Sequence, residues 1–283
     1  MQKKTFSAWI NRKLEKCGSG RRVTDLYYDL RDGHVLLSLL ETLTGSHMAR
    51  ETGGLRVHHL ANTAAVLGCL QRQRVAVPGI NNVAVVDGHP AMTLDLVWAI
   101  ILHWQFHQTL VDSSLPPGLA NSNVEKILLA WCRQSLSSSP LPDHAPLRNF
   151  TTDWADGLAF AGVLLAHSPN IVGPETVLDK APEPRLGLVF RLAESHLGIP
   201  CLLEPADLCR GAVDRKCVLL YVMCLFAALP HDEVTEESLL DVSLASDPGF
   251  RVNVDGSPAK TPVTLNNSWY FVISTIQQRD PVR

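Results

Sequence analysis

The sequence lacks the features that mark secreted and membrane-spanning proteins. Its seven cysteines include no C-x-x-C pair, and an odd number of thiols without paired spacing favours neither a disulfide framework nor a zinc site. The longest apolar run, residues 218–229, is shorter than the roughly 20 residues that a transmembrane helix needs. Residues 1–17 are basic and polar, unlike a secretion signal. These absences predict a cytosolic protein with reduced thiols.

Catalytic and ligand-binding motifs are also missing. The chain has no G-x-x-x-x-G-K-[ST], G-x-G-x-x-G, G-x-S-x-G or H-E-x-x-H pattern. His103 and His107 lie one helical turn apart but have no evident third ligand, and residues 29–33 lack the distal glutamate of a calcium loop. We therefore expect no enzyme activity, no cofactor and no metal. Nucleic acid is not an expected partner, since the tryptophans fall on apolar helix stripes and the pI is about 6.4.

The charge of the chain is unevenly distributed. The 283 residues are 46% hydrophobic and 19% charged, which suits a folded protein of two domains, and the net charge is −3. Residues 1–115 contain 12 Lys and Arg against 9 Asp and Glu, whereas the remainder contains 13 against 19. Within the first 22 residues, seven cations face only Glu15. This basic segment predicts an acidic partner, and a solvated helix face is the alternative.

The sequence contains an internal repeat. Residues 4–9 (KTFSAW) match residues 126–131 (KILLAW) at an offset of 122, and residues 30–33 (LRDG) match residues 154–157 (WADG) at an offset of 124. Self-similarity over such a distance indicates duplication of a domain of about 105 residues. We predict a first domain over residues 1–109, a linker over 110–123 and a second domain over 124–230. The rest, 231–283, is acidic and then contains Gly and Pro, and is predicted to be a partly ordered tail.

Each copy is predicted to be helical. Apolar residues recur at helical spacing from Phe6 to Leu14, and Asp32 can cap a buried helix that extends to Leu43. Further helices are expected over residues 59–72 and 92–107, and in the second copy over 124–136, 156–167, 185–197 and 214–229. Alternation typical of strands is scarce. The expected fold class is all-α.

Several sequence blocks resemble a known family. Residues 2–9 (QKKTFSAW), 25–33 (DLYYDLRDG), 96–104 (LVWAIILHW) and 149–157 (NFTTDWADG) are similar to the signatures of tandem calponin-homology actin-binding domains. Within that superfamily, residues 123–135 resemble dystrophin and utrophin most, while residues 23–33 are equally similar to β-spectrin and the plakins. The resemblance implies two calponin-homology domains, each with four main helices and short connecting helices.

The resemblance also implies a function and a location. It points to a cytoskeletal linker at the cell cortex that tethers filamentous actin to the membrane cortex or to other cytoskeletal proteins. Membrane-associated complex proteins would be bound through parts beyond this chain. A protein-interaction scaffold with weak or lost actin binding is the alternative.

Three helical surfaces are implied to contact actin, formed by residues 3–12, 94–111 and 126–136. The candidate contact residues are Lys3, Lys4, Thr5, Phe6, Ala8, Arg12, Lys13, Leu94, Val97, Ile101, Gln105, Gln108, Lys126, Leu129 and Arg133. The tryptophans beside them are expected to be core. Ala91, Asp95 and Asp112 place less positive charge on the second surface than is usual in the family, which predicts reduced affinity.

Overall fold

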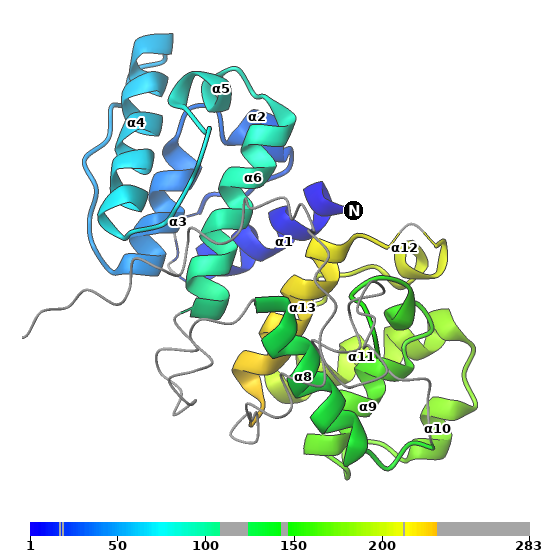
Figure 1. Ribbon diagram of the computed structural model, residues 1–283. Helices are drawn as coiled ribbons and strands as arrows, with labels where there is room; N and C mark the ends of the chain where they lie inside the picture. The colour runs from blue at the N-terminus through cyan, green and yellow to red at the C-terminus, as the bar shows by residue number, and fades with distance from the viewer. Residues whose placement is uncertain (17, 19, 108–123, 143–146, 212, 231–283) are drawn as a thin grey trace, which may run out of the picture.

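The structure is a computed structural model that describes residues 1–16, 18, 20–107, 124–142, 147–211 and 213–230 (Figure 1). These residues form helices and loops and no strand, which confirms the expected all-α fold. The first copy contains α1 (Gln2–Glu15), α2 (Leu26–Asp29), α3 (His34–Thr44), α4 (Arg56–Arg72), α5 (Asn82–Val86), α6 (Pro90–Ile101) and η1 (Leu102–His107). The second contains α8 (Val124–Ser137), η3 (Thr152–Trp154), α9 (Leu158–His167), α10 (Pro174–Leu178), α11 (Pro182–Leu197), α12 (Pro205–Cys209) and α13 (Arg215–Ala228).

The main helices lie where the apolar periodicity predicts them, with one change of geometry. The helix expected over residues 92–107 is α-helical only to Ile101, after which η1 is a π-helical turn. The predicted linker, residues 110–123, and the predicted tail, residues 231–283, lie outside the described residues. Among the described residues, no helix is long and apolar enough to cross a membrane.

The two copies begin their buried helices in the same way. Asp32 and Asp156 each accept a hydrogen bond at Oδ1 from the backbone N–H two residues later, at 2.9 Å in both copies. The N-cap itself is the following glycine, so Asp32 lies one residue before the capping position that the sequence predicted for it. The intervening Gly33 and Gly157 have φ of 77° and 81°, a left-handed conformation that favours glycine. A Cβ on Gly33 would lie 2.7 Å from the Cβ of Asn62, so α3 and α4 approach closely there.

A second shared turn precedes this one. Asp29 accepts hydrogen bonds at Oδ2 from the backbone N–H groups five and four residues before it, at 2.7 and 2.8 Å. Asp153 makes the same two bonds, at 2.7 and 3.1 Å. Because these residues are 124 positions apart, the hydrogen bonds support the repeat seen in the sequence.

The tryptophans at the centre of each copy are buried, as predicted. Trp9, Trp98 and Trp131 are 2%, 5% and 2% exposed. The indole N–H of Trp9 donates to Gln105 Oε1, and that of Trp131 donates to the carbonyl of Pro230, both at 3.1 Å. Satisfying these two donors allows the rings of Trp9 and Trp131 to be buried without loss of hydrogen bonding, whereas the buried indole N–H of Trp98 has no hydrogen-bond partner among the described residues.

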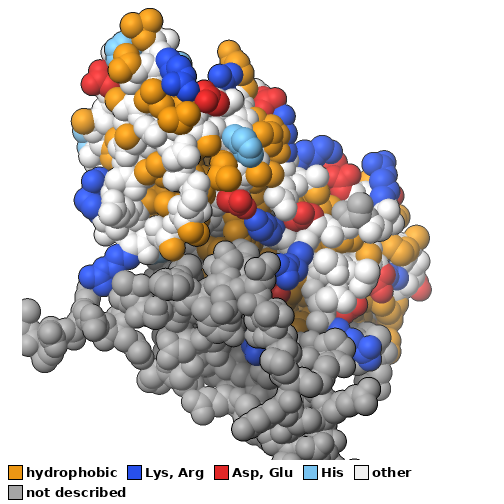
Figure 2. Space-filling view, turned by 45° about the horizontal axis from the view of Figure 1, so that its top comes forward, with side chains coloured by type: hydrophobic (Ala, Val, Ile, Leu, Met, Phe, Trp, Pro, Cys, Tyr) orange, Lys and Arg blue, Asp and Glu red, His pale blue; other side chains and the backbone are white. Residues whose placement is uncertain are grey.

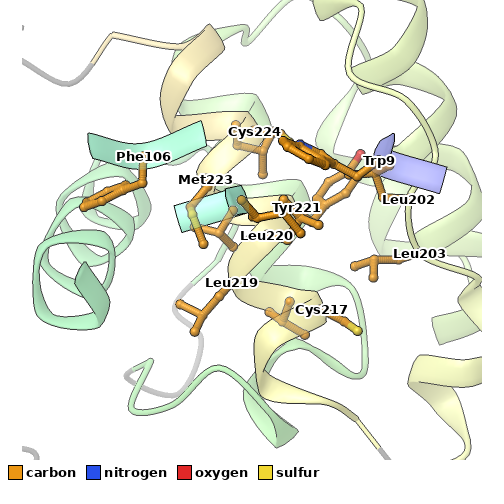
Figure 3. Packing of buried hydrophobic residues seen from close by; sticks show 14 of the residues in the cluster. Trp9, Phe106, Leu202, Leu203, Cys217, Leu219, Leu220, Tyr221, Met223 and Cys224 are labelled. Atoms are coloured by element: carbon orange, nitrogen blue, oxygen red, sulfur yellow. The ribbon is translucent and has the colours of Figure 1, made fainter. Parts of the chain in front are cut away.

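The two copies pack together along the last helix of the second copy. Helix α13 contacts both α1 and η1, and ten of its residues are buried. The rings of Phe106 and Phe226 lie 5.8 Å apart with an interplanar angle of 42°. Figure 3 shows Trp9 and Phe106 of the first copy beside the buried side chains of α13. One apolar core therefore runs through both copies.

Candidate functional site

The first predicted surface, on α1, separates into exposed and buried residues. Lys4 and Arg12 are exposed, and Lys3, Ala8 and Lys13 are half-buried. Thr5 and Phe6 are 2% and 0% exposed, which differs from the expectation that they contact a partner. They lie in the core because α1 packs on α3 and α6 of its own copy and on α13 of the other. The exposed residues of α1 are Lys4, Arg12 and Glu15.

Three of the cations of α1 are paired with carboxylates, and Arg12 Nη1 lies 3.4 Å from Glu15 of the same helix. Lys4 Nζ lies 2.9 Å from Glu204 and 3.7 Å from Asp207, both in the second copy, and the hydrogen bond to Glu204 raises the pKa of Lys4. Lys3 Nζ lies 2.7 Å from Asp25, and this hydrogen bond lowers the pKa of the carboxyl group. The contact of Lys4 ties the basic end of α1 to the second copy.

Lys13 lies at the boundary between the copies. Its ammonium group is 5.4 Å from the centroid of the Trp9 ring, and burial lowers its pKa. A cavity of about 170 Å³ there is lined by Trp9, Arg12 and Lys13 from the first copy and by residues 197–200 and Cys224 from the second. Burial raises the pKa of the Cys224 thiol to about 12, so this thiol is unreactive at neutral pH. Lys13 thus faces the second copy as well as the solvent.

The second predicted surface, on α6 and η1, is mostly apolar and buried. Val97 and Ile101 are both 0% exposed and lie in the core, while Leu94 and Gln105 are half-buried. Gln108 lies outside the described residues. The apolar residues of α6 are buried because this helix is central to the first copy, where it packs against α1, α2 and α5.

Asp95 on this surface has a role that the sequence did not predict. Its carboxylate lies 3.1 Å from Lys216 Nζ of α13, and the same ammonium group is 5.7 Å from the centroid of the Trp98 ring. The negative charge expected to weaken the second surface is therefore engaged by the second copy. Ala91 is exposed, and Asp112 lies outside the described residues.

The third predicted surface, on α8, offers one exposed cation. Lys126 is exposed, whereas Leu129 is 5% exposed and packs in the core. Arg133 is half-buried, and its Nε donates to the carbonyl of Leu147 at 2.7 Å. This bond makes Arg133 a residue that positions the loop after α8.

Charges of both signs are interspersed on the surface. On the face shown in Figure 2, Lys and Arg side chains lie among Asp and Glu side chains and form no continuous patch of one charge sign.

Sequence reasoning missed Glu204, Asp207 and Lys216 as partners of the first copy. No local signal could have found them, because their partners are more than 100 residues away in the sequence.

The described residues contain no group of three or more metal-ligating side chains. Burial lowers the pKa of His103. Ser135 Oγ lies 2.9 Å from His167 Nε2, but this histidine ring stacks on Trp131 at 5.8 Å and Ser135 is 5% exposed. The pair therefore belongs to the core packing of the second copy.

Comparison with known proteins gives matches over most of the chain. The family model of the calponin homology (CH) domain matches residues 1–106 and 122–231. Utrophin from Rattus norvegicus is 40% identical over 242 residues, which are 86% of this chain and 7% of that protein. Spectrin beta chain, non-erythrocytic 4, from Homo sapiens is 37% identical over 227 residues, 80% of this chain and 9% of that protein. The chain spans less than a tenth of the length of these relatives.

A solved structure has the same fold. The crystal structure of the actin-crosslinking core of Schizosaccharomyces pombe fimbrin superposes with a TM-score of 0.63 at 21% identity, over 83% of this chain and 51% of that one. At this identity the likeness concerns the fold alone.

Proposed function

The chain belongs to the calponin homology domain family, with two copies of the domain in tandem, and from this membership we propose that it binds filamentous actin. The relatives support this proposal, because utrophin and a β-spectrin match both copies at 40% and 37% identity. The sequence blocks that resemble actin-binding members support it as well.

The observation that carries the proposal is the set of exposed cations on the helices that open each copy. Arg12 and Lys4 on α1 and Lys126 on α8 are all exposed, with Lys4 paired to Glu204 and Arg12 to Glu15. An acidic filament would attract these positively charged side chains, and this electrostatic attraction weakens as the salt concentration rises. Each exposed ionic contact contributes about 0.2–1 kcal/mol, so affinity depends on several of them together. Buried Phe6, Thr5, Val97, Ile101 and Leu129 would support this surface from below.

We further propose that the module serves a cytoskeletal linker at the cell cortex. In this role it would tether actin filaments to the membrane cortex or to other cytoskeletal proteins, and contacts with membrane-associated complexes would lie beyond this chain. The longer relatives, utrophin and a β-spectrin, support the assignment to the cytoskeleton. We propose no catalytic role.

Cosedimentation of the full chain with filamentous actin at about 50 and 150 mM salt tests the proposal. We expect saturable pelleting that decreases with salt. The double variant Arg12→Gln/Lys126→Gln should bind about threefold to tenfold more weakly at the lower salt, because two ionic contacts are lost. The matched control is Arg56→Gln, which neutralises an exposed arginine of α4 that pairs with Asp87 outside the three surfaces. Equal binding by the double variant and the control would contradict the proposed surface.

A second candidate function is an interaction scaffold with weak or lost actin binding. The observation that favours it is the engagement of Lys4 by Glu204 and Asp207, which reduces the cationic surface available on α1. If the folded chain does not pellet with actin at either salt, and a pull-down recovers a different protein, this function replaces the first.

A further inference from the structure

An open cavity of about 580 Å³ lies on the first copy, apart from the three surfaces discussed above. It is bounded by the segment before α2, by α2 itself and by the start of α3. Its polar lining consists mainly of Arg21, Arg22, Tyr28, Asp29, Arg31 and Asp32. The volume falls within the range of small-molecule sites, and three arginines around one cavity are suited to an anion.

Arg31 is fixed in position at this cavity. Its Nε donates to the carbonyl of Val86 at 2.7 Å, and its guanidinium carbon lies 5.9 Å from the centroid of the Tyr28 ring. Since the guanidinium group has five N–H donors and this bond uses one, the Nη groups remain as donors. The ring of Tyr28 is itself 70% exposed and offers an apolar face at the cavity.

The two carboxylates of the cavity are engaged in the local turn. Asp29 accepts three hydrogen bonds, from the backbone N–H groups of Thr24 and Asp25 and from the Thr24 hydroxyl, at 2.7 to 3.0 Å. Burial opposes ionisation of Asp29, but these bonds outweigh it and lower its pKa. Asp32 accepts the N–H that opens α3. These carboxylates therefore serve the backbone turn and are not positioned primarily as ligands of a cation.

The second copy provides an internal comparison. It keeps both carboxylates of the turn, as Asp153 and Asp156, with the same hydrogen bonds. The second copy lacks the three arginines and the tyrosine of the cavity. At an offset of 124, Ala145, Pro146, Thr152 and Ala155 occupy the positions that match Arg21, Arg22, Tyr28 and Arg31. The carboxylates thus belong to the shared fold, whereas the arginines and the tyrosine are particular to the first copy.

We propose that this cavity binds a phosphate monoester, with the dianionic phosphoryl group on the arginines and its organic substituent against Tyr28. Guanidinium groups bind phosphate oxygens through paired N–H donors, and an anchored arginine loses less conformational freedom on binding than a mobile one. The cavity has room for more than an inorganic ion. The phosphoryl group could be carried by a soluble metabolite or by a lipid headgroup, which share this chemistry.

Calorimetric titration of the full chain with phenyl phosphate tests the proposal. We expect saturable binding at one site, and inorganic phosphate, which has no ring to stack on Tyr28, should bind about twofold to tenfold more weakly. The variant Arg21→Gln/Arg22→Gln should reduce the affinity about threefold to tenfold, and Tyr28→Ala should remove the preference for phenyl phosphate. Arg56→Gln is the control for loss of an exposed arginine elsewhere on the first copy.

Vesicles of phosphatidylcholine with and without phosphatidic acid distinguish the two sources. Binding of phenyl phosphate assigns the site to soluble monoesters. Binding to phosphatidic acid vesicles alone, lost in Arg21→Gln/Arg22→Gln and kept in Arg56→Gln, assigns it to a lipid headgroup. The proposal is overturned if neither probe binds, or if the double variant and the control bind equally well.

Discussion

Arg185 allows the clearest quantitative prediction, because it holds three segments of the second copy together. It is 9% exposed, and its guanidinium group donates only to backbone carbonyls in the contacts that the structure shows. Nε donates to Val177 at 3.0 Å, Nη1 to Asp156 at 2.8 Å, and Nη2 to Lys180 at 2.6 Å and to Leu178 at 3.4 Å. These bonds join α11 to the end of α10 and to the turn that precedes α9.

The substitution Arg185→Met keeps most of the apolar stem and removes every donor. Hydrogen bonds to a charged group contribute about 1.5–3 kcal/mol each, and a carbonyl left buried without a partner costs about 1–3 kcal/mol. Because the four bonds share one group and their energies do not add, we expect a total loss of about 3–5 kcal/mol in the free energy of unfolding of the second copy. Native-state hydrogen exchange of the amides in α9 and α11 measures this loss within the second copy.

The matched control for this experiment is Arg191→Met. Arg191 is on the same helix but is exposed, so its replacement should change the free energy of unfolding by less than about 0.5 kcal/mol. A loss below about 1 kcal/mol in Arg185→Met, or an equal loss in both variants, would refute the assignment of Arg185 as the residue that holds these segments.

Three further predictions concern the first copy and its boundary with the second. Gly33→Ala should destabilise the chain by about 2 kcal/mol or more in thermal unfolding, because φ is 77° and a Cβ would lie 2.7 Å from a carbon of α4; Gly45→Ala, with φ of 67° and open space, should cost less. Burial lowers the pKa of Lys13 from its ordinary 10.5, so the unfolded chain binds more protons between the two values and the free energy of unfolding should rise with pH in that window. Buried thiols with raised pKa values, such as Cys224, act in the opposite direction over this range, so the test is the difference between the two chains: in a urea titration series the free energy of unfolding of the natural chain should rise with pH relative to that of Lys13→Met. Glu204→Gln removes the ion pair between Glu204 and Lys4, so pelleting with actin at low salt should increase. Unchanged pelleting would show that this ion pair does not limit binding.

The fold could be predicted largely from the sequence because its signals are local or repeated. Apolar periodicity placed the main helices, and the repeated Asp-Gly pairs at 32–33 and 156–157 marked the same turn twice. The change to π-helical geometry after Ile101 was not predicted, since the apolar pattern continues through it. Arg185 was not predicted as a core residue because its partners are backbone carbonyls. Every residue has a backbone carbonyl, so the sequence does not indicate which ones accept these hydrogen bonds.

The candidate site could be predicted only in part. Helical spacing identifies an apolar face, but it does not show that α1 packs on helices of both copies, and this packing places Phe6 in the core. The ion pairs of Lys4 with Glu204 and of Asp95 with Lys216 join residues 200 and 121 positions apart. Only the packing of the two copies brings these charges together.

The position of α13 has a mechanical consequence for a chain held at one end by a filament. Asp214, which caps α13, also accepts a hydrogen bond from Gln2 of α1 at 2.7 Å, while Pro230 beyond its other end accepts one from Trp131 at 3.1 Å. Tension applied beyond Pro230 would reach the bond to Trp131 first. The force would then pass along α13, whose buried residues contact both copies, so the two copies would share it. The helix thus connects a pull applied beyond Pro230 to α1 of the other copy.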